Sequence, residues 1–194
     1  MDIRHHTKPM NTFTKVTLGT ITTLATIVPS ALAGYQVEGY HLMDGNDFGP
    51  QHKAVATQLI DTLTEIGVPV FDGGKNNIEI CVPNEDGSQT LGYYVPSKDY
   101  MVVCTDGINK DLQMETLVHE TVHVIQDLRD GLDNSSLVGP EGEYFQKLAD
   151  GLPTYKANTI TSMYDREDWA IEAEAFFFED KGQTVADELD NWKF

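Results

Sequence analysis

The chain has 194 residues and a formal net charge of −18. This length is typical of one domain, since domains usually run ~100–200 residues. The excess of acidic residues argues against nucleic acids and anionic membrane surfaces as partners, because both attract proteins with positive potential.

The first 33 residues have the pattern of a secretory signal peptide. A basic segment precedes the stretch 16–33, which carries no charged residue and ends in Ala-Leu-Ala before Gly34. This order of basic, apolar and small residues is typical of a cleaved export signal. Polar residues and a proline interrupt the apolar part, which makes it a poor permanent membrane span. We therefore predict one mature domain, 34–194, that is secreted or periplasmic and free of the membrane after cleavage.

The first half of the mature chain is predicted to hold one helix and a small sheet. Apolar residues at helical spacing predict a helix over 51–66, ended by Gly67. The next segment, around Pro69 and the Asp-Gly-Gly cluster at 72–74, is interpreted as a loop. Short runs rich in β-branched and aromatic residues, separated by turn residues, then predict strands. These strands cover 78–82, 91–95 and 100–104.

From Lys110 onward the pattern is helical. The clearest helix covers 112–129 and is stopped by Gly131. Further helices are predicted over 141–148, 153–161, 166–179 and 183–192. The predicted fold class is therefore α+β, with a small, mostly antiparallel sheet followed by a long helix and a helical C-terminal half.

Cys81 and Cys104 are the two cysteines of the chain. One pair in an exported protein favours a disulfide, with two buried free thiols as the alternative. Each cysteine lies near the end of a predicted strand. We therefore predict a disulfide that ties neighbouring strands together.

The long helix contains His119-Glu120-Thr121-Val122-His123, an H-E-x-x-H motif. Residues four apart lie on one face of a helix, so both imidazoles can reach one metal ion. Glu120 is rotated by about 100° from His119, which lets it approach a metal-bound water instead of the metal. The motif thus predicts a zinc ion held by His119 and His123, with Glu120 as the general base that activates water.

A third protein ligand is expected, because catalytic zinc usually keeps three protein ligands and one open site. The metzincin extension would place glycine and histidine where Gln126 and Arg129 stand, so that class is excluded. No histidine follows His123, which leaves acidic residues. Glu172 and Glu174 are the best candidates, since acids in an apolar helix are costly unless paired or metal-bound. They lie about 200° apart on a helix, so only one can face the ion, and the helical wheel alone does not decide which.

The H-E-x-x-H motif with a glutamate on a later helix resembles the gluzincin metallopeptidases. The run Glu172–Ala175 is similar to the E-x-E-A signature of several gluzincin branches, although Phe176 stands where those branches usually have Asp or Asn. In these branches the first glutamate binds the metal, so the resemblance implies Glu172 as the third ligand. It also implies a zincin-like fold, in which strand 91–95 or 100–104 would line the substrate cleft.

Several polar residues are weaker candidates. Asp127 lies one turn beyond His123 and could accept a hydrogen bond from a ligand histidine, or could be a solvated acid near the helix end. Three tyrosines of the helical half could supply an oxyanion donor, but an ordinary core or surface position is the preferred interpretation of each: Tyr144, Tyr155 and Tyr164.

Together, these patterns predict an exported zinc metallopeptidase that hydrolyses peptide bonds in a protein or peptide substrate. The alternative is a secreted, zincin-like binding protein that keeps the metal site but is not catalytic. A structural domain with a fortuitous motif is the third reading.

Overall fold

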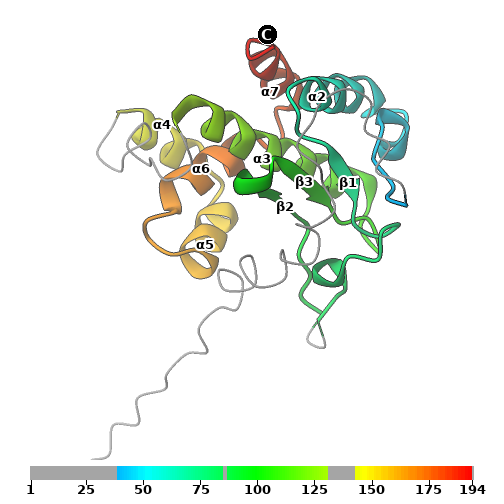
Figure 1. Ribbon diagram of the computed structural model, residues 1–194. Coiled ribbons are helices and arrows are strands. Elements are labelled where there is room, and N and C mark those ends of the chain that lie inside the picture. The colour runs from blue at the N-terminus through cyan, green and yellow to red at the C-terminus, as the bar shows by residue number, and fades with distance from the viewer. Residues whose placement is uncertain (1–38, 85–86, 131–142, 194) are drawn as a thin grey trace, which may run out of the picture.

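The computed structural model describes residues 39–84, 87–130 and 143–193. They form a mixed α+β fold with a small three-stranded sheet and mostly helices (Figure 1), in agreement with the predicted class. The predicted signal peptide, 1–33, lies outside the described residues. Within them, no helix is long and apolar enough to cross a membrane.

The sheet half begins with a short 3-10 helix and the first long helix. Its elements are η1 (Gly45–Phe48), α2 (Lys53–Glu65), β1 (Val70–Asp72), η2 (Glu79–Cys81), β2 (Gly92–Val95), η3 (Pro96–Lys98) and β3 (Tyr100–Val103). Helix α2 confirms the helix predicted over 51–66, and β2 and β3 confirm two of the predicted strands.

The three strands are ordered β1-β3-β2, with β3 in the middle and fully buried. The β2–β3 pairing is antiparallel, as predicted, but β1 runs parallel to β3. Side chains of β3 alternate between the two faces of the sheet. Met101 and Val103 join the main core with α2 and α3, whereas Tyr100 and Val102 join a smaller apolar cluster on the other face.

The prediction of a strand over 78–82 is wrong. This segment forms η2, in which the N–H of Cys81 donates to the carbonyl of Ile78 and that of Val82 to the carbonyl of Glu79. The strand lies earlier, at β1, in the segment interpreted as a loop. Because β1 and β2 occupy both edges of β3, the segment 78–82 has no edge of β3 left to pair with.

Cys81 and Cys104 form the predicted disulfide, with their Cα atoms 5.2 Å apart. Both cysteines are buried in the smaller apolar cluster. The bond ties η2 to the residue that follows β3, so it joins a helical turn to a strand instead of joining two strands.

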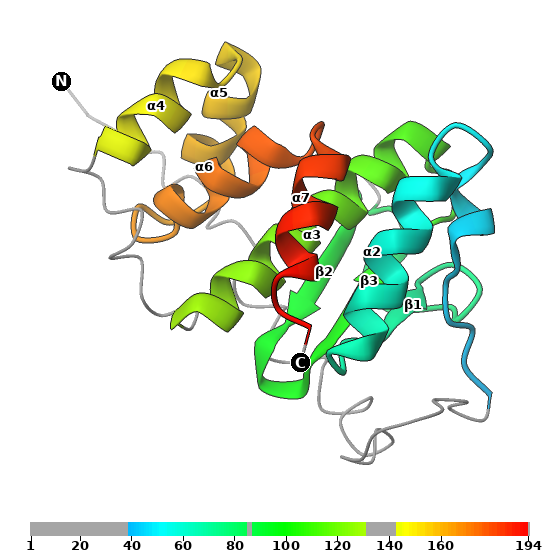
Figure 2. The ribbon, with the colours of Figure 1, turned by 90° about the horizontal axis from the view of Figure 1, so that it is seen from above.

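The helices of the second half confirm the five predicted ones, with shifted ends. They are α3 (Lys110–Asp130), α4 (Glu143–Gly151), α5 (Thr154–Met163), α6 (Trp169–Phe178) and α7 (Gly182–Asp190). Figure 2 shows α2, α3 and α7 side by side on one face of the sheet. Helices α4, α5 and α6 gather on the β2 side of the sheet, away from β1 (Figure 1).

Helix α3 is central because it packs against the sheet, α7 and α6. Its approach to β2 depends on Gly92. A Cβ atom there would lie 2.5 Å from Cγ2 of Thr116 and 2.8 Å from the carbonyl oxygen of Val102. Only glycine permits this spacing, which brings the middle of α3 close to the edge strand.

Candidate metal centre

The two histidines of the H-E-x-x-H motif project from the same face of α3. His119 and His123 are both buried, and their ring centroids are 5.0 Å apart. Phe176 of α6 packs its ring against that of His119, with 4.8 Å between centroids. The helical spacing and the packing of α6 therefore hold both imidazoles in one water-poor region.

Glu172 completes the cluster from the first turn of α6. One carboxylate oxygen, Oε2, lies 3.4 Å from Nε2 of His119, and the other, Oε1, lies 3.6 Å from Nε2 of His123. One ligand atom from each of the three residues lies within 4.8 Å of the others. The structure thus brings together His119, His123 and Glu172, the three ligands predicted from the sequence.

The donor set fits a metal ion. Oε2 of Glu172 is buried and has no hydrogen-bond partner among the described residues, although an unpaired buried oxygen is costly. The Nε2 atoms of His119 and His123 face this carboxylate. Two imidazole nitrogens and a carboxylate oxygen are ligands that divalent transition metals accept. This buried cluster could therefore hold a metal ion.

Glu174, the alternative third ligand, lies outside the cluster. It is only 3% exposed, and its Oε2 accepts hydrogen bonds from Nε2 of Gln126 at 2.8 Å and from Nη2 of Arg129 at 2.7 Å. The two glutamates of the E-x-E run are thus both buried, but Glu172 faces the histidines and Glu174 faces a different set of α3 side chains.

The second ring nitrogen of each histidine also has a partner. Nδ1 of His119 lies 3.3 Å from Oε2 of Glu179, whose other oxygen is 3.0 Å from Nζ of the buried Lys156. Nδ1 of His123 lies 2.8 Å from Oε1 of Gln126. Since such outer partners orient metal ligands, both imidazoles are held with Nε2 toward Glu172. Sequence reasoning did not find Glu179 or Lys156, because no local pattern links them to His119.

Charges inside the cluster shift the pKa values of His119 and Glu172 in opposite directions. Burial lowers the pKa of His119, but the neighbouring carboxylates of Glu172 and Glu179 outweigh it and raise that pKa to about 10. Burial raises the pKa of Glu172, but the charge of His123 and the ion-pair contact with His119 outweigh it and lower that pKa. Without a bound ion, the cluster therefore favours an imidazolium at His119 next to the carboxylate of Glu172.

Glu120 lies beside the cluster and is not part of it. It is buried, and burial raises its pKa, while the neighbouring histidines and a backbone hydrogen bond from Tyr94 of β2 oppose that rise. A buried carboxylate with a raised pKa next to a metal site is suited to accept a proton. Glu120 therefore lies next to the three side chains that could hold a metal ion, without being one of them.

Tyr164 is the tyrosine that faces the site. It lies between α5 and α6, its ring is 6.3 Å from that of Phe176, and burial together with the charges of Glu172 and Glu120 raises the pKa of its hydroxyl. Tyr155, by contrast, is 67% exposed. The side chain of Tyr144 lies outside the described residues.

Of the two interpretations of Asp127, the described contacts do not include a hydrogen bond to a ligand histidine. The carboxylate of Asp127 accepts a hydrogen bond from the hydroxyl of Tyr94 at 2.8 Å, which links α3 to β2. The ligand histidines have other partners, Glu179 and Gln126.

No family model, curated protein or solved structure matches this chain. The geometry of the site is therefore the ground for proposing a function.

Proposed function

We propose that this protein is an exported, zinc-dependent metallopeptidase of gluzincin type with a zincin-like fold. The observation that carries the proposal is the buried cluster of His119, His123 and Glu172 with Glu120 beside it. Two histidines and a glutamate are the ligand set of several zinc peptidases, and an adjacent glutamate is their general base.

Each residue then has one role in peptide hydrolysis. Zinc, when bound by the cluster, would lower the pKa of a water ligand to ~7 and polarise the scissile carbonyl. Glu120 accepts the proton of the attacking water and passes it to the leaving amine. The hydroxyl of Tyr164 donates a hydrogen bond to the oxygen on which negative charge develops.

The edge strand β2 supports a peptide as the substrate. The carbonyl of Leu91 accepts a hydrogen bond from Cys104, so in this antiparallel ladder Tyr93 and Val95 bond to β3 while Gly92 and Tyr94 point their backbone groups outward. Tyr94 also donates its N–H to Glu120. An extended peptide added along this edge would therefore pass next to the general base. Strand β3 is paired on both sides and cannot bind a peptide in this way.

Export is supported by two features. The disulfide between Cys81 and Cys104 is typical of an oxidising compartment. The N-terminal pattern predicts a cleaved signal peptide.

The test is zinc analysis of the purified mature chain together with cleavage of a mixed peptide library. We expect about one zinc per chain, because one such site is proposed. Replacing Glu120 with Gln should leave the zinc content unchanged and lower the cleavage rate by about 10²–10⁴-fold, the usual contribution of a general base. A chain that binds no zinc would refute the metal site. A chain that binds zinc but cleaves nothing in the library would favour the non-catalytic binding protein.

A further inference from the structure

We propose that Gln126, Glu174 and Arg129 form a positioning network that fixes the imidazole of His123 for metal binding. The inference rests on the proposed metal site and adds a role for the second glutamate of the E-x-E run. Gln126 and Arg129 lie three and six residues after His123 on α3, and Glu174 comes from α6.

The network is a continuous chain of short hydrogen bonds. Nη2 of Arg129 donates to Oε2 of Glu174 at 2.7 Å, and Nε2 of Gln126 donates to the same oxygen at 2.8 Å. Nε2 of Gln126 also donates to the carbonyl of Ile171 at 3.0 Å, and Oε1 of Gln126 lies 2.8 Å from Nδ1 of His123. Only the last bond touches a metal ligand, so Glu174 and Arg129 act through Gln126.

The direction of the Gln126 amide decides which nitrogen of His123 is free. Both neighbours of its Nε2 are acceptors, a carboxylate and a backbone carbonyl, so the amide nitrogen must point to them. The amide oxygen then faces Nδ1 of His123 and accepts its proton. Nε2 of His123 is left with a lone pair on the side of Glu172, where the metal ligands converge.

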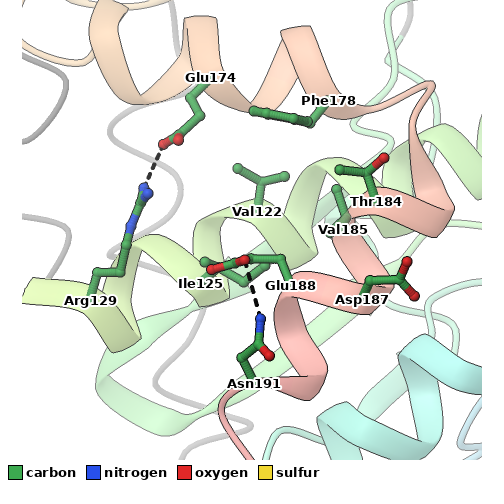
Figure 3. A pocket seen from close by; sticks show the side chains of 10 residues that line it. All are labelled: Val122, Ile125, Arg129, Glu174, Phe178, Thr184, Val185, Asp187, Glu188 and Asn191. Atoms are coloured by element: carbon green, nitrogen blue, oxygen red, sulfur yellow. Dashed lines mark hydrogen bonds and ion pairs between the residues drawn. The ribbon is translucent and has the colours of Figure 1, made fainter. Parts of the chain in front are cut away.

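Arg129 holds the far end of the network at the wall of a pocket. Figure 3 shows Arg129 reaching from α3 across to Glu174 on α6, at one side of a cavity of about 630 Å³ between α3, α6 and α7. Glu174 is nearly fully buried, and a buried carboxylate needs a cation or several donors. Arg129 thereby stabilises the carboxylate form of Glu174, which accepts the hydrogen bond from the amide of Gln126.

A simple clamp between α3 and α6 would use the same contacts, so the test must separate the two roles. The variants are Gln126→Met, Glu174→Leu and the double variant, and the zinc dissociation constant is measured by chelator competition. Each single change should weaken zinc binding about 10–100-fold, as loss of an outer partner usually does. The double variant should bind zinc no more weakly than the single variant with the lower zinc affinity, because Glu174 acts through Gln126. Glu174→Gln should retain most of the affinity, since its amide oxygen still accepts from Gln126 and Arg129.

A second measurement needs no metal. In the metal-free wild-type protein, at a pH high enough for the His123 ring to be neutral, nitrogen NMR should show its single ring proton on Nδ1, and Gln126→Met should lose this preference. The matched control is Glu188→Gln, which changes an acid of the same pocket whose described hydrogen bond is to Asn191. It should alter neither measurement.

If the losses of zinc affinity in Gln126→Met and Glu174→Leu multiply in the double variant, the two residues act independently and the proposed network is refuted. An unchanged His123 proton position in Gln126→Met would overturn it as well. If Glu174→Leu does not fold, the NMR measurement on Gln126→Met tests the proposal by itself. A wild-type chain with the proton on Nδ1 but no zinc would refute the proposed function, while the finding that the network fixes the tautomer of His123 would stand.

Discussion

The two histidines of the proposed metal site, His119 and His123, are supported in different ways. His119 has a charged partner, Glu179, which comes from beyond the end of α6 and is itself paired with Lys156 of α5. His123 has a neutral partner, Gln126, only three residues further along its own helix. The orientation of His119 therefore depends on how α5 and α6 pack against α3. That of His123 depends first on Gln126, which lies on the same helix.

This difference has a consequence for energetics. Removing Glu179 would leave the ammonium group of Lys156 buried, with the carbonyl of Phe176 as its remaining described partner, which is costly for a charge. Removing Gln126 would leave no unpaired charge, because Arg129 and Glu174 still neutralise each other. The support of His119 should therefore couple metal affinity to stability more strongly than the support of His123.

The largest effect is expected at Glu172, whose carboxylate lies next to both histidines. Glu172→Ala should weaken zinc binding by more than ~100-fold, beyond the range of an outer partner, because it removes one of the three proposed metal ligands. Glu174→Ala is the matched control on the same helix, and it should weaken binding less. Zinc dissociation constants of the two variants decide the matter. If Glu174→Ala proves the more damaging, the ligand assignment is wrong.

Glu179→Ala should show the charged support of His119. We expect the free energy of unfolding to fall by about 3–5 kcal/mol, as for other broken buried ion pairs, and zinc affinity to fall about 10–100-fold. The variant with both Glu179→Ala and Lys156→Met removes the stranded charge. It should recover much of the stability in denaturant titrations but not the zinc affinity. Recovery of both would mean that Glu179 acts on the fold alone.

Of the two helices that form the site, α3 and its functional residues could be predicted from the sequence, whereas the contacts made by α6 could not. The apolar spacing of α3 and the H-E-x-x-H motif are local patterns, so the helix, His119, His123 and Glu120 follow from the sequence. The choice of Glu172 over Glu174 needed a resemblance, because both side chains are buried and the helical wheel treats them alike. Once α6 is placed against α3, the two acids separate by their partners.

Long-range packing is what the sequence could not supply. Strand β1 is three residues long and is flanked by a proline and two glycines, so its local signal is that of a loop. It is a strand because β3 offers it a parallel edge. Lys156 and Glu179 are likewise ordinary charged residues until α5 and α6 bring them together behind His119.

The disulfide offers a perturbation on the other face of the sheet. Cys81→Ser with Cys104→Ser should lower the free energy of unfolding by about 2–4 kcal/mol, since the bond closes a loop of moderate length. Zinc affinity of the folded protein should not change, because the cysteines belong to the smaller apolar cluster and not to the core that contains α3. A matching loss of zinc affinity would show that the two faces of the sheet are coupled.

The smallest effect is expected at the contact between β2 and α3. Tyr94→Phe removes the hydroxyl that donates to Asp127, and the free energy of unfolding should fall by about 0.5–1.5 kcal/mol, the usual net value of one hydrogen bond. The backbone N–H of Tyr94, which bonds Glu120, is unaffected by this change. Zinc affinity should stay the same, because the carboxylate of Asp127 has no described hydrogen bond to either ligand histidine. A tenfold loss of zinc affinity in Tyr94→Phe, measured beside Asp127→Asn, would instead make Asp127 part of the support of the metal site.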